Sequence, residues 1–375
     1  MLHRLDLAFG NFSKGGGRPR FRSEKRWNQF EFQHGDRAIR WDGSRDRITI
    51  PGVGLVKTRD KRKRVIPRHG RAMVFRRCGR WYALFECEVA PKPLPATGEV
   101  VGIDRGVRVL AATSNGQLIA NARPGTVMAR DVARAQRTVE RRTLRDSAGR
   151  VLNRDGKNRA RALLALRKVW RRVACVRRGY LHEVARALVD RYDAIAFEKL
   201  SVKSMTRSAK GKLPATPSRG VSAKKRLNYA MLDASLAMLR ILVGEKAASA
   251  ARVVIDVPAA YSSQTCSECG SVAAEARSGE RYACVNASCG FVGDADVNAA
   301  RVIAQRAFGG PAGRGTGQPD PMICEVSYRR ATPGSRDRLS REGTPHDSLR
   351  SKLDDGSREH VGRRVEVSRA PSTRS

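Results

Sequence analysis

Acidic residues are scarce in this sequence. Its 375 residues include 36 Asp and Glu against 74 Lys and Arg, which gives a formal net charge of +38. A surplus of this size is typical of a protein whose partner is a polyanion, and it favours nucleic acid. A basic surface that is only solvated is the alternative, and the clustering of the basic residues along the chain argues against it.

Membrane and export signals are also missing. No apolar run approaches the length of a membrane span, and no secretory signal is present. Four of the eight cysteines, Cys78, Cys87, Cys175 and Cys324, are scattered, and the other four have the close spacing of a metal site. This usage indicates a reducing compartment. We therefore expect a cytoplasmic protein with no membrane partner.

The clustered cysteines lie within residues 261–292. They form two short-spaced pairs, Cys266 with Cys269 and Cys284 with Cys289. Two such pairs are typical of a closed site in which four thiolates bind one structural zinc ion. Gly270 and Gly290 follow the second cysteine of each pair and suit tight turns. Four unrelated cysteines, buried or free, are the alternative.

Residues 1–98 have the pattern of a β-rich, basic domain. Apolar residues recur in short alternating runs, at Phe30, Phe32, Ile48, Ile50, Val74, Trp81, Leu84 and Phe85. Turns rich in Gly, Asp and Arg separate these runs, so we expect a small β-barrel. Arg18, Arg20 and Arg22 are candidates for phosphate contacts, with a flexible solvated loop as the alternative. A proline-rich segment over 91–95 predicts a stiff linker.

A second domain, 99–308, begins with an apolar strand that ends in Asp104. A strand over 108–113 and another over 118–120, joined by an Asn-Gly turn, complete a predicted three-stranded meander. RNase H-like nucleases begin with an acidic residue in such a strand. A plain Asp-Arg-Gly turn is the alternative explanation.

Residues 126–191 are expected to form a helical hairpin, with a break between its two helices over 147–156. Residues 156–180 contain nine Lys or Arg and no acid. Such a face suits the phosphates of a duplex, whereas a solvated helix usually mixes both signs. The candidate nucleic-acid contacts are Lys157, Arg159, Arg161, Arg167, Lys168, Arg171, Arg172, Arg177 and Arg178.

Two further acids attract attention by their positions. Glu198 ends a short apolar strand, and a surface acid at a strand end is the alternative. Asp296 lies on the same helix face as Ala300 and Ile303, where an acid is costly unless it is paired or binds a metal. Asp294 suits the N-cap of this helix, and a second capping role is the alternative for Asp296.

Together, Asp104, Glu198 and Asp296 form a set of ligands suited to catalytic metal ions. A phosphodiester is cleaved by two divalent ions a few ångströms apart, which activate water and stabilise the leaving oxygen. Magnesium prefers carboxylate oxygens as ligands. We therefore predict that the three acids converge beside a basic channel and bind two catalytic magnesium ions.

Four motifs in order carry a family resemblance. GIDRG at 102–106, AFEKLSVKSM at 196–205, YSSQTCSECG at 261–270 and DADVNAA at 294–300 resemble the TnpB (OrfB-type) proteins that insertion sequences encode. That family is related to the type V CRISPR effectors. The resemblance extends from about residue 2 to residue 307.

The resemblance implies an α/β fold and an activity. A wedge-type β-barrel domain would precede a RuvC-like (RNase H-like) nuclease domain, into which the helical hairpin and a zinc knuckle are inserted. Asp104, Glu198 and Asp296 match the catalytic acids of the family, and the four cysteines match its zinc ligands. The implied activity is cleavage of target DNA guided by an RNA made from the element's own end, in the context of transposition and recombination.

The chain departs from the family pattern in two places. A strand and a helical recognition region normally precede the stretch that resembles residues 2–12, so we expect a chain truncated at its amino end. The second cysteine pair has four intervening residues where two are commoner, and a longer turn can still close the site. Residues 309–375 lose the pattern and are expected to form a disordered tail.

Two other functions compete with guided cleavage. A nuclease-silent, nucleic-acid-binding remnant would follow from loss of the amino-terminal region. A zinc-finger regulator without enzymatic activity would not need the three acids, which the chain retains.

The charge pattern predicts how binding should depend on salt. Binding through phosphates releases counterions, so the affinity for RNA and DNA should fall steeply as salt rises, by roughly a thousandfold between 50 and 200 mM for about six phosphate contacts. Affinity measured by fluorescence anisotropy across that range checks this. An affinity independent of salt would contradict it.

Overall fold

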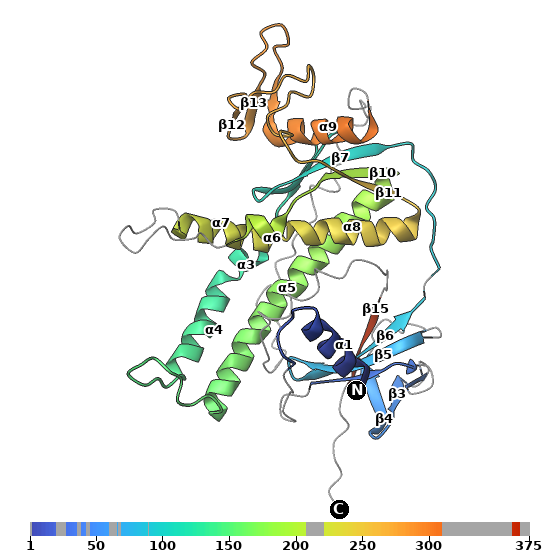
Figure 1. Cartoon of the computed structure of the whole chain (residues 1–375), viewed down its shortest axis with the longest axis vertical. Coiled ribbons are helices and arrows are strands. Elements are labelled where there is room, and N and C mark those ends of the chain that lie inside the picture. Colours follow the sequence, from blue (N-terminus) through green and yellow to red (C-terminus); the bar gives the residue numbers. More distant parts are fainter. Residues whose placement is uncertain are drawn as a thin grey trace, which may run out of the picture. The chain divides into compact units, whose positions relative to one another are not determined.

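The structure is a computed structural model of the whole chain (Figure 1). It describes residues 2–19, 28–35, 39–42, 46–59, 66, 69–88, 90–207, 221–309 and 362–367. The chain divides into two compact units. The first contains Met1–Val89, Thr138–Lys168 and Ser340–Ser375, and the second contains Ala90–Arg137 and Val169–Leu339. The predicted contacts Arg20 and Arg22 lie outside the described residues.

The first unit is built around a seven-stranded sheet. Its described elements are α1 (Leu2–Ser13), β1 (Gln29–Phe32), β2 (Arg40–Asp42), β3 (Arg47–Ile50), β4 (Gly54–Arg59), β5 (His69–Arg77), β6 (Arg80–Cys87) and β15 (Gly362–Val367). The strand order is β1-β5-β6-β15-β4-β3-β2. Ile48 and Ile50 alternate with exposed residues in β3 and pack with Val74 and Phe85 in the core. The predicted β-rich pattern is therefore confirmed.

Two expectations about the first unit need correction. The order of the described strands is open, with β1 and β2 at its edges, so these strands do not form the expected closed barrel. Within the predicted disordered tail, β15 pairs antiparallel with β6 along its whole length and with the end of β4. Strand pairing uses backbone groups, which any sequence supplies, so the composition of the tail did not indicate it.

The second unit is mixed α/β. Its central sheet has the order β11-β10-β7-β8-β9. The strands are β7 (Val100–Arg105), β8 (Val109–Thr113), β9 (Leu118–Ala120), β10 (Ala194–Glu198) and β11 (Val253–Val257). β7, β8 and β9 form the predicted antiparallel meander, whereas β10 runs parallel to both β7 and β11. Gly116 adopts φ +93° in the turn before β9, a conformation that glycine favours.

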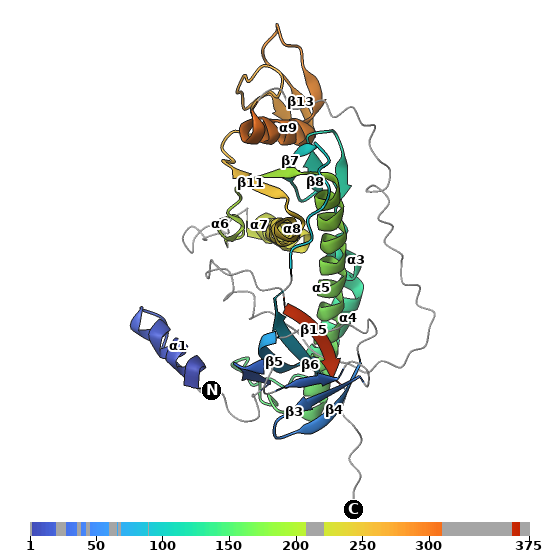
Figure 2. The same ribbon diagram turned by 90° about the vertical axis from the view of Figure 1, so that its right-hand side faces the viewer.

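Helices cover both faces of this sheet (Figures 1 and 2). The helices described from residue 124 to residue 308 are α3 (Pro124–Val127), α4 (Ala129–Arg141), α5 (Lys157–Arg191), α6 (Val202–Met205), α7 (Val221–Ala234), α8 (Leu236–Ala250) and α9 (Ala295–Phe308). Residues 138–141 of α4 and 157–168 of α5 belong to the first unit. On one face, Ile103 and Phe197 pack in a core with residues of α5 and α8 such as Leu188 and Leu239. On the other face, Ala196 packs against α9. The predicted hairpin break falls between α4 and α5.

The segment Val221–Ala250 is long and apolar enough to cross a membrane by length and composition alone. The expectation that no run approaches that length is therefore wrong for this segment. Ser235, in a left-handed conformation, divides it into α7 and α8, and Leu239 and Val243 are buried in the core of the second unit. Leu232, in α7, is 57% exposed.

Helix α9 packs unusually close to β7. A Cβ atom added to Gly102 would overlap the carbonyl oxygen of Ala300 and lie 2.5 Å from the amide nitrogen of Ala304. Only glycine allows the backbones of strand and helix to approach to this distance. Ala300 and Ala304, which meet Gly102, are two of the small buried residues of α9.

The contact predicts the effect of enlarging Gly102. Gly102→Ala should destabilise the second unit by about 1 to 3 kcal/mol, because the added methyl group must push α9 away from β7. Gly179→Ala is the matched control, because the same methyl group meets nothing within 4 Å there. In the helix α5 it should stabilise by roughly 1 kcal/mol. Denaturant unfolding of the purified variants measures both, and a Gly102→Ala protein of unchanged stability would contradict the prediction.

Candidate active site and metal centre

Asp104 and Glu198 lie side by side at the ends of two parallel strands. The register pairs Phe197 of β10 with Ile103 of β7, so the next residues along, Glu198 and Asp104, are neighbours. Side chains alternate between the faces of a strand, which places both acids on the face that α9 covers. A hydrogen bond joins the two carboxyl groups.

Asp296 approaches the same place from the first turn of α9. Asp294 is the N-cap of this helix, as predicted, and its side chain accepts hydrogen bonds from the backbone N–H groups of Asp296 (2.9 Å) and Val297 (3.0 Å). The capping role is thus filled by Asp294, and the Asp296 side chain is free to point elsewhere. It is 14% exposed, and its charge acts on Asp104. The three predicted acids are therefore brought together.

The electrostatics of the cluster follow from burial. Burial, together with the charge of the adjacent Glu198, raises the pKa of Asp104 to about 8. Burial also raises the pKa of Glu198, while its hydrogen bond with Asp104 opposes that shift. Two carboxyl groups that share a hydrogen bond out of water cannot easily both ionise unless a cation joins them. Three carboxyl groups are also the donor set that magnesium prefers, so these residues fit a divalent ion.

Two arginines contact Asp296, and sequence reasoning missed both. Arg277, on β12 (Arg277–Ser278) of the cysteine-rich segment, places Nη2 2.7 Å from Oδ1 of Asp296. Arg108 lies 3.5 Å from Oδ2 and also pairs with Glu280 at 2.6 Å. The cysteine-rich segment therefore contributes a guanidinium group to the acidic cluster. Nothing in the sequence around Arg277 indicates this contact, because Arg277 lies in a surface hairpin.

A third arginine supports the cluster from the opposite face of the sheet. Arg105 is buried, donates to the backbone carbonyls of Glu198 and Leu236, and lies 5.1 Å from the ring centroid of Phe197. Burial lowers the pKa of its guanidinium group. Arg105 thus ties the end of β10 to the start of α8. In the sequence it is only the residue after Asp104 and carries no pattern of its own.

The four predicted cysteines converge on one point. Their sulfur atoms all lie within 4.8 Å of one another, with 3.8 Å between Cys266 and Cys289 and 3.5 Å between Cys269 and Cys284. Tetrahedral zinc at about 2.3 Å from each sulfur requires sulfur–sulfur distances of roughly 3.8 Å. Four thiolates this close would repel one another without a dication between them. The residues therefore fit a single zinc ion.

The cysteine-rich segment forms a small unit of its own. It contains β12, β13 (Arg281–Ala283) and β14 (Val292–Asp294) in an antiparallel sheet. Gly270 and Gly290 adopt φ +76° and +60° after the second cysteine of each pair, which confirms the predicted turns. Cys266 and Tyr282 are buried in its core.

Asn298 fastens this segment to α9. Its buried side chain accepts from the backbone N–H of Ser267 at 2.9 Å and donates to the carbonyl of Thr265 at 2.7 Å. These partners flank Cys266 directly. The same helix therefore carries Asp296 and anchors the first cysteine turn.

The predicted nucleic-acid contacts occupy different environments. Arg18, Lys157, Arg161, Arg172 and Arg178 are exposed, and Arg159, Arg167, Lys168, Arg171 and Arg177 are partly buried. Arg177 pairs with the buried Asp233, at 2.6 Å between Nη2 and Oδ1. Asp233 also accepts from the backbone N–H groups of Gly125 and Thr126. This contact gives Arg177 a structural role within the second unit.

Two family comparisons cover the chain from β6 to α9. Residues 84–209 match the family OrfB_IS605, described as "Probable transposase", and residues 237–303 match the TNB domain of Cas12f1-like proteins. The second match covers the cysteines and Asp296, and the first covers Asp104 and Glu198.

Curated relatives agree with these matches. One, from Escherichia coli (strain K12), is named "Putative RNA-guided DNA endonuclease InsQ" and is 30% identical over 305 residues, which cover 80% of this chain and 72% of the relative. Another, from Streptomyces pristinaespiralis, is named "Putative RNA-guided DNA endonuclease" and is 28% identical over 313 residues, covering 80% of this chain and 69% of the relative. The chain belongs to the TnpB (OrfB-type) family of insertion-sequence proteins.

Solved structures show a weaker likeness. The complex of Cas12f1 with its guide RNA and target DNA is 16% identical at a TM-score of 0.37, over 63% of this chain and 56% of that one. A CRISPR-Cas12f ternary complex gives the same identity and TM-score over 67% and 51%. The chain thus spans little more than half of these structures, and a TM-score this low supports no inference.

The cysteine geometry predicts one tightly bound zinc ion. Metal analysis of the purified protein should find about one zinc per chain, and Cys266→Ser combined with Cys284→Ser should remove it, because the site keeps only two thiolates. Cys175→Ser is the control, since Cys175 is exposed and lies outside the cluster. Protein without zinc, or a double variant that keeps its zinc, would contradict the prediction.

Proposed function

We propose that this protein is a transposon-encoded, RNA-guided, magnesium-dependent DNA endonuclease of the TnpB type. The observation that carries the proposal is the convergence of Asp104, Glu198 and Asp296 from two strand ends and a helix. Family membership supports it, because relatives are named as RNA-guided DNA endonucleases. The meander β7–β9, followed by the parallel strands β10 and β11, supports a RuvC-like domain.

The three acids would hold two magnesium ions. Bound there, the ions would supply a nucleophilic water and stabilise the leaving oxygen of a phosphodiester. The protein's own contribution is to keep the carboxyl groups fixed, through Arg105 behind Glu198 and the N-cap at Asp294 before Asp296. Arg277 and Arg108 supply positive charge beside the cluster, which offsets repulsion between the acids and a phosphate.

The proposed partners are a guide RNA from the element's end and a target DNA. The exposed basic residues of α5, among them Lys157, Arg161, Arg172 and Arg178, supply phosphate contacts. Transposition and recombination are the setting implied by the family. A location in the cytoplasm, in association with the nucleoid, follows from these partners.

Replacing any one of the three acids should separate cutting from binding. Asp104→Ala, Glu198→Ala and Asp296→Ala should each abolish cleavage of duplex DNA and leave its binding nearly intact, because a carboxylate assists a phosphate only through the metal. The assay is cleavage in magnesium by protein co-expressed with the RNA that flanks its element. Binding of the same duplex is measured in parallel.

Asp294→Ala is the matched control for these variants. It removes an acid from the same helix start but takes away only the cap, so we expect a loss of about 1 kcal/mol of stability and retained cleavage. Cleavage by Asp104→Ala protein would show that the assignment of the acids is wrong. A parent protein that binds its RNA and DNA in magnesium without cutting would instead be the nuclease-silent form.

A further inference from the structure

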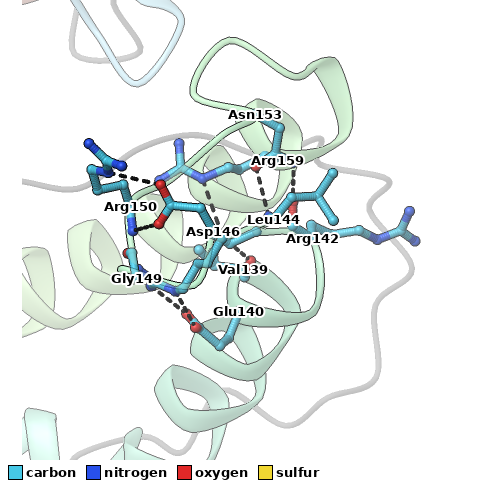
Figure 3. A network of polar contacts seen from close by, with 11 residues as sticks. Val139, Glu140, Arg142, Leu144, Asp146, Gly149, Arg150, Asn153 and Arg159 are labelled. Carbon is cyan, nitrogen blue, oxygen red and sulfur yellow. Dashed lines mark hydrogen bonds and ion pairs between the residues drawn. The ribbon is translucent and has the colours of Figure 1, made fainter.

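The loop that joins α4 to α5 is an ordered hairpin. Residues 142–156 fold back as a short hairpin whose strands meet at an isolated bridge between Arg145 and Val151 (Figure 3). The backbone N–H of Leu152 also donates to the carbonyl of Leu144 at 2.9 Å. Leu144 and Leu152 are therefore direct neighbours across this hairpin.

Polar side chains of the hairpin hydrogen-bond to its own backbone. Asp146 accepts from the backbone N–H of Arg150 at 2.7 Å and pairs with its guanidinium group at 2.8 Å. Asn153 accepts from the N–H of Leu144 at 2.9 Å and donates to the carbonyl of Arg142 at 2.8 Å. Figure 3 shows these contacts as one continuous network. The backbone at the tip is thus held in one conformation.

Two arginines of the network are also fixed from the neighbouring helices. Arg145 pairs with Glu140 at 3.1 Å and donates to the carbonyl of Gly149. Arg159 donates to the hydroxyl of Thr143 at 3.2 Å. These contacts join the tip to the end of α4 and the start of α5.

The braced tip exposes its two leucines. Leu144 is 61% exposed and Leu152 is 65% exposed, although both sit on a backbone that many hydrogen bonds hold in place. Neither side chain contributes to a core of the protein. Leu144 and Leu152 together form a small exposed apolar patch, which we call the apolar step. Apolar residues that are scattered singly over a surface are ordinary, whereas two adjacent ones on an ordered turn are not.

The surroundings of this step are basic. Residues 142–157 contain five Lys or Arg and two Asp. The side chains of Arg142, Arg154 and Lys157 are exposed, and Asp146 is already paired with Arg150. An apolar step between positive charges complements a nucleic-acid groove, where sugars and base edges form the floor and phosphates form both rims.

We propose that Leu144 and Leu152 form a wedge that inserts into the groove of a bound duplex while the surrounding arginines contact its phosphates. The proposal rests on the proposed function for its choice of partner. An anionic membrane offers similar chemistry, but two leucines bury too little apolar area to hold a protein there. The wedge adds affinity and register that phosphate contacts alone do not supply.

The test compares the full-length parent protein with the double variant Leu144→Ser/Leu152→Ser. Labelled DNA, RNA and RNA–DNA duplexes of about 20 base pairs serve as probes in anisotropy titrations over a range of salt. We expect the double variant to lose roughly tenfold in affinity for the duplex that the wedge contacts. The slope of affinity against salt should stay unchanged, because no phosphate contact is lost.

Two controls separate the wedge from general effects. Leu232→Ser removes a leucine of similar exposure from α7 and should bind like the parent. Lys157→Gln should reduce the salt slope by about one contact, which the leucine variant should not do. Thermal unfolding of each variant confirms that the fold is intact, as expected for exposed positions.

Parental affinity of the double variant for all three duplexes would overturn the proposal. Loss of binding to vesicles of anionic phospholipid, with duplex binding unchanged, would overturn it in favour of a membrane contact. Failure of the parent protein to bind any nucleic acid would contradict the proposed function itself. The outcomes for the wedge and for the function are therefore distinguishable.

Discussion

The cluster of three acids depends on the close contact between β7 and α9 at Gly102. Four residues of an α-helix rise about 6 Å, and two residues of a strand advance about 6.6 Å. Because α9 meets Gly102 at Ala300, the helix position four residues earlier comes to lie near the strand position two residues later. Those positions are Asp296 and Asp104. A single missing Cβ atom therefore sets the distance between two of the three acids.

Other contacts place the remaining parts of the site. Arg105 holds the end of β10 from the face of the sheet opposite the carboxyl groups. Asn298 joins the first cysteine turn to α9, two residues after Asp296. The cysteine-rich segment is thereby joined to α9 and also brings Arg277 to the cluster. Helix α9 therefore contacts both the cysteine turn and the acidic cluster.

Local features of the sequence predicted the helices, the strands and the three acids. The features that were not predicted depend on contacts between residues far apart in the sequence. Asp104 and Glu198 stand at the ends of short apolar strands, and the N-cap at Asp294 leaves Asp296 with another task. Arg277 shows no such signal, because a charged residue in a hairpin is solvated until that hairpin folds beside α9. In the first sheet β15 lies between β6 and β4, and these partners lie far away in the sequence. Apolar residues that recur with a period of 2 or 3.6 indicate whether a segment is a strand or a helix. They do not indicate which distant segments that strand or helix will contact.

The order of the acids along the chain has a consequence for protein synthesis. More than ninety residues separate each acid from the next, and Asp296 lies in the last described helix of its unit. A nascent chain leaves the ribosome amino end first, so β7, the basic helix α5 and β10 emerge well before α9. An incomplete chain therefore carries the basic residues of α5 while it still lacks the third carboxylate. Premature termination upstream of α9 would yield a basic polypeptide without the complete acidic cluster.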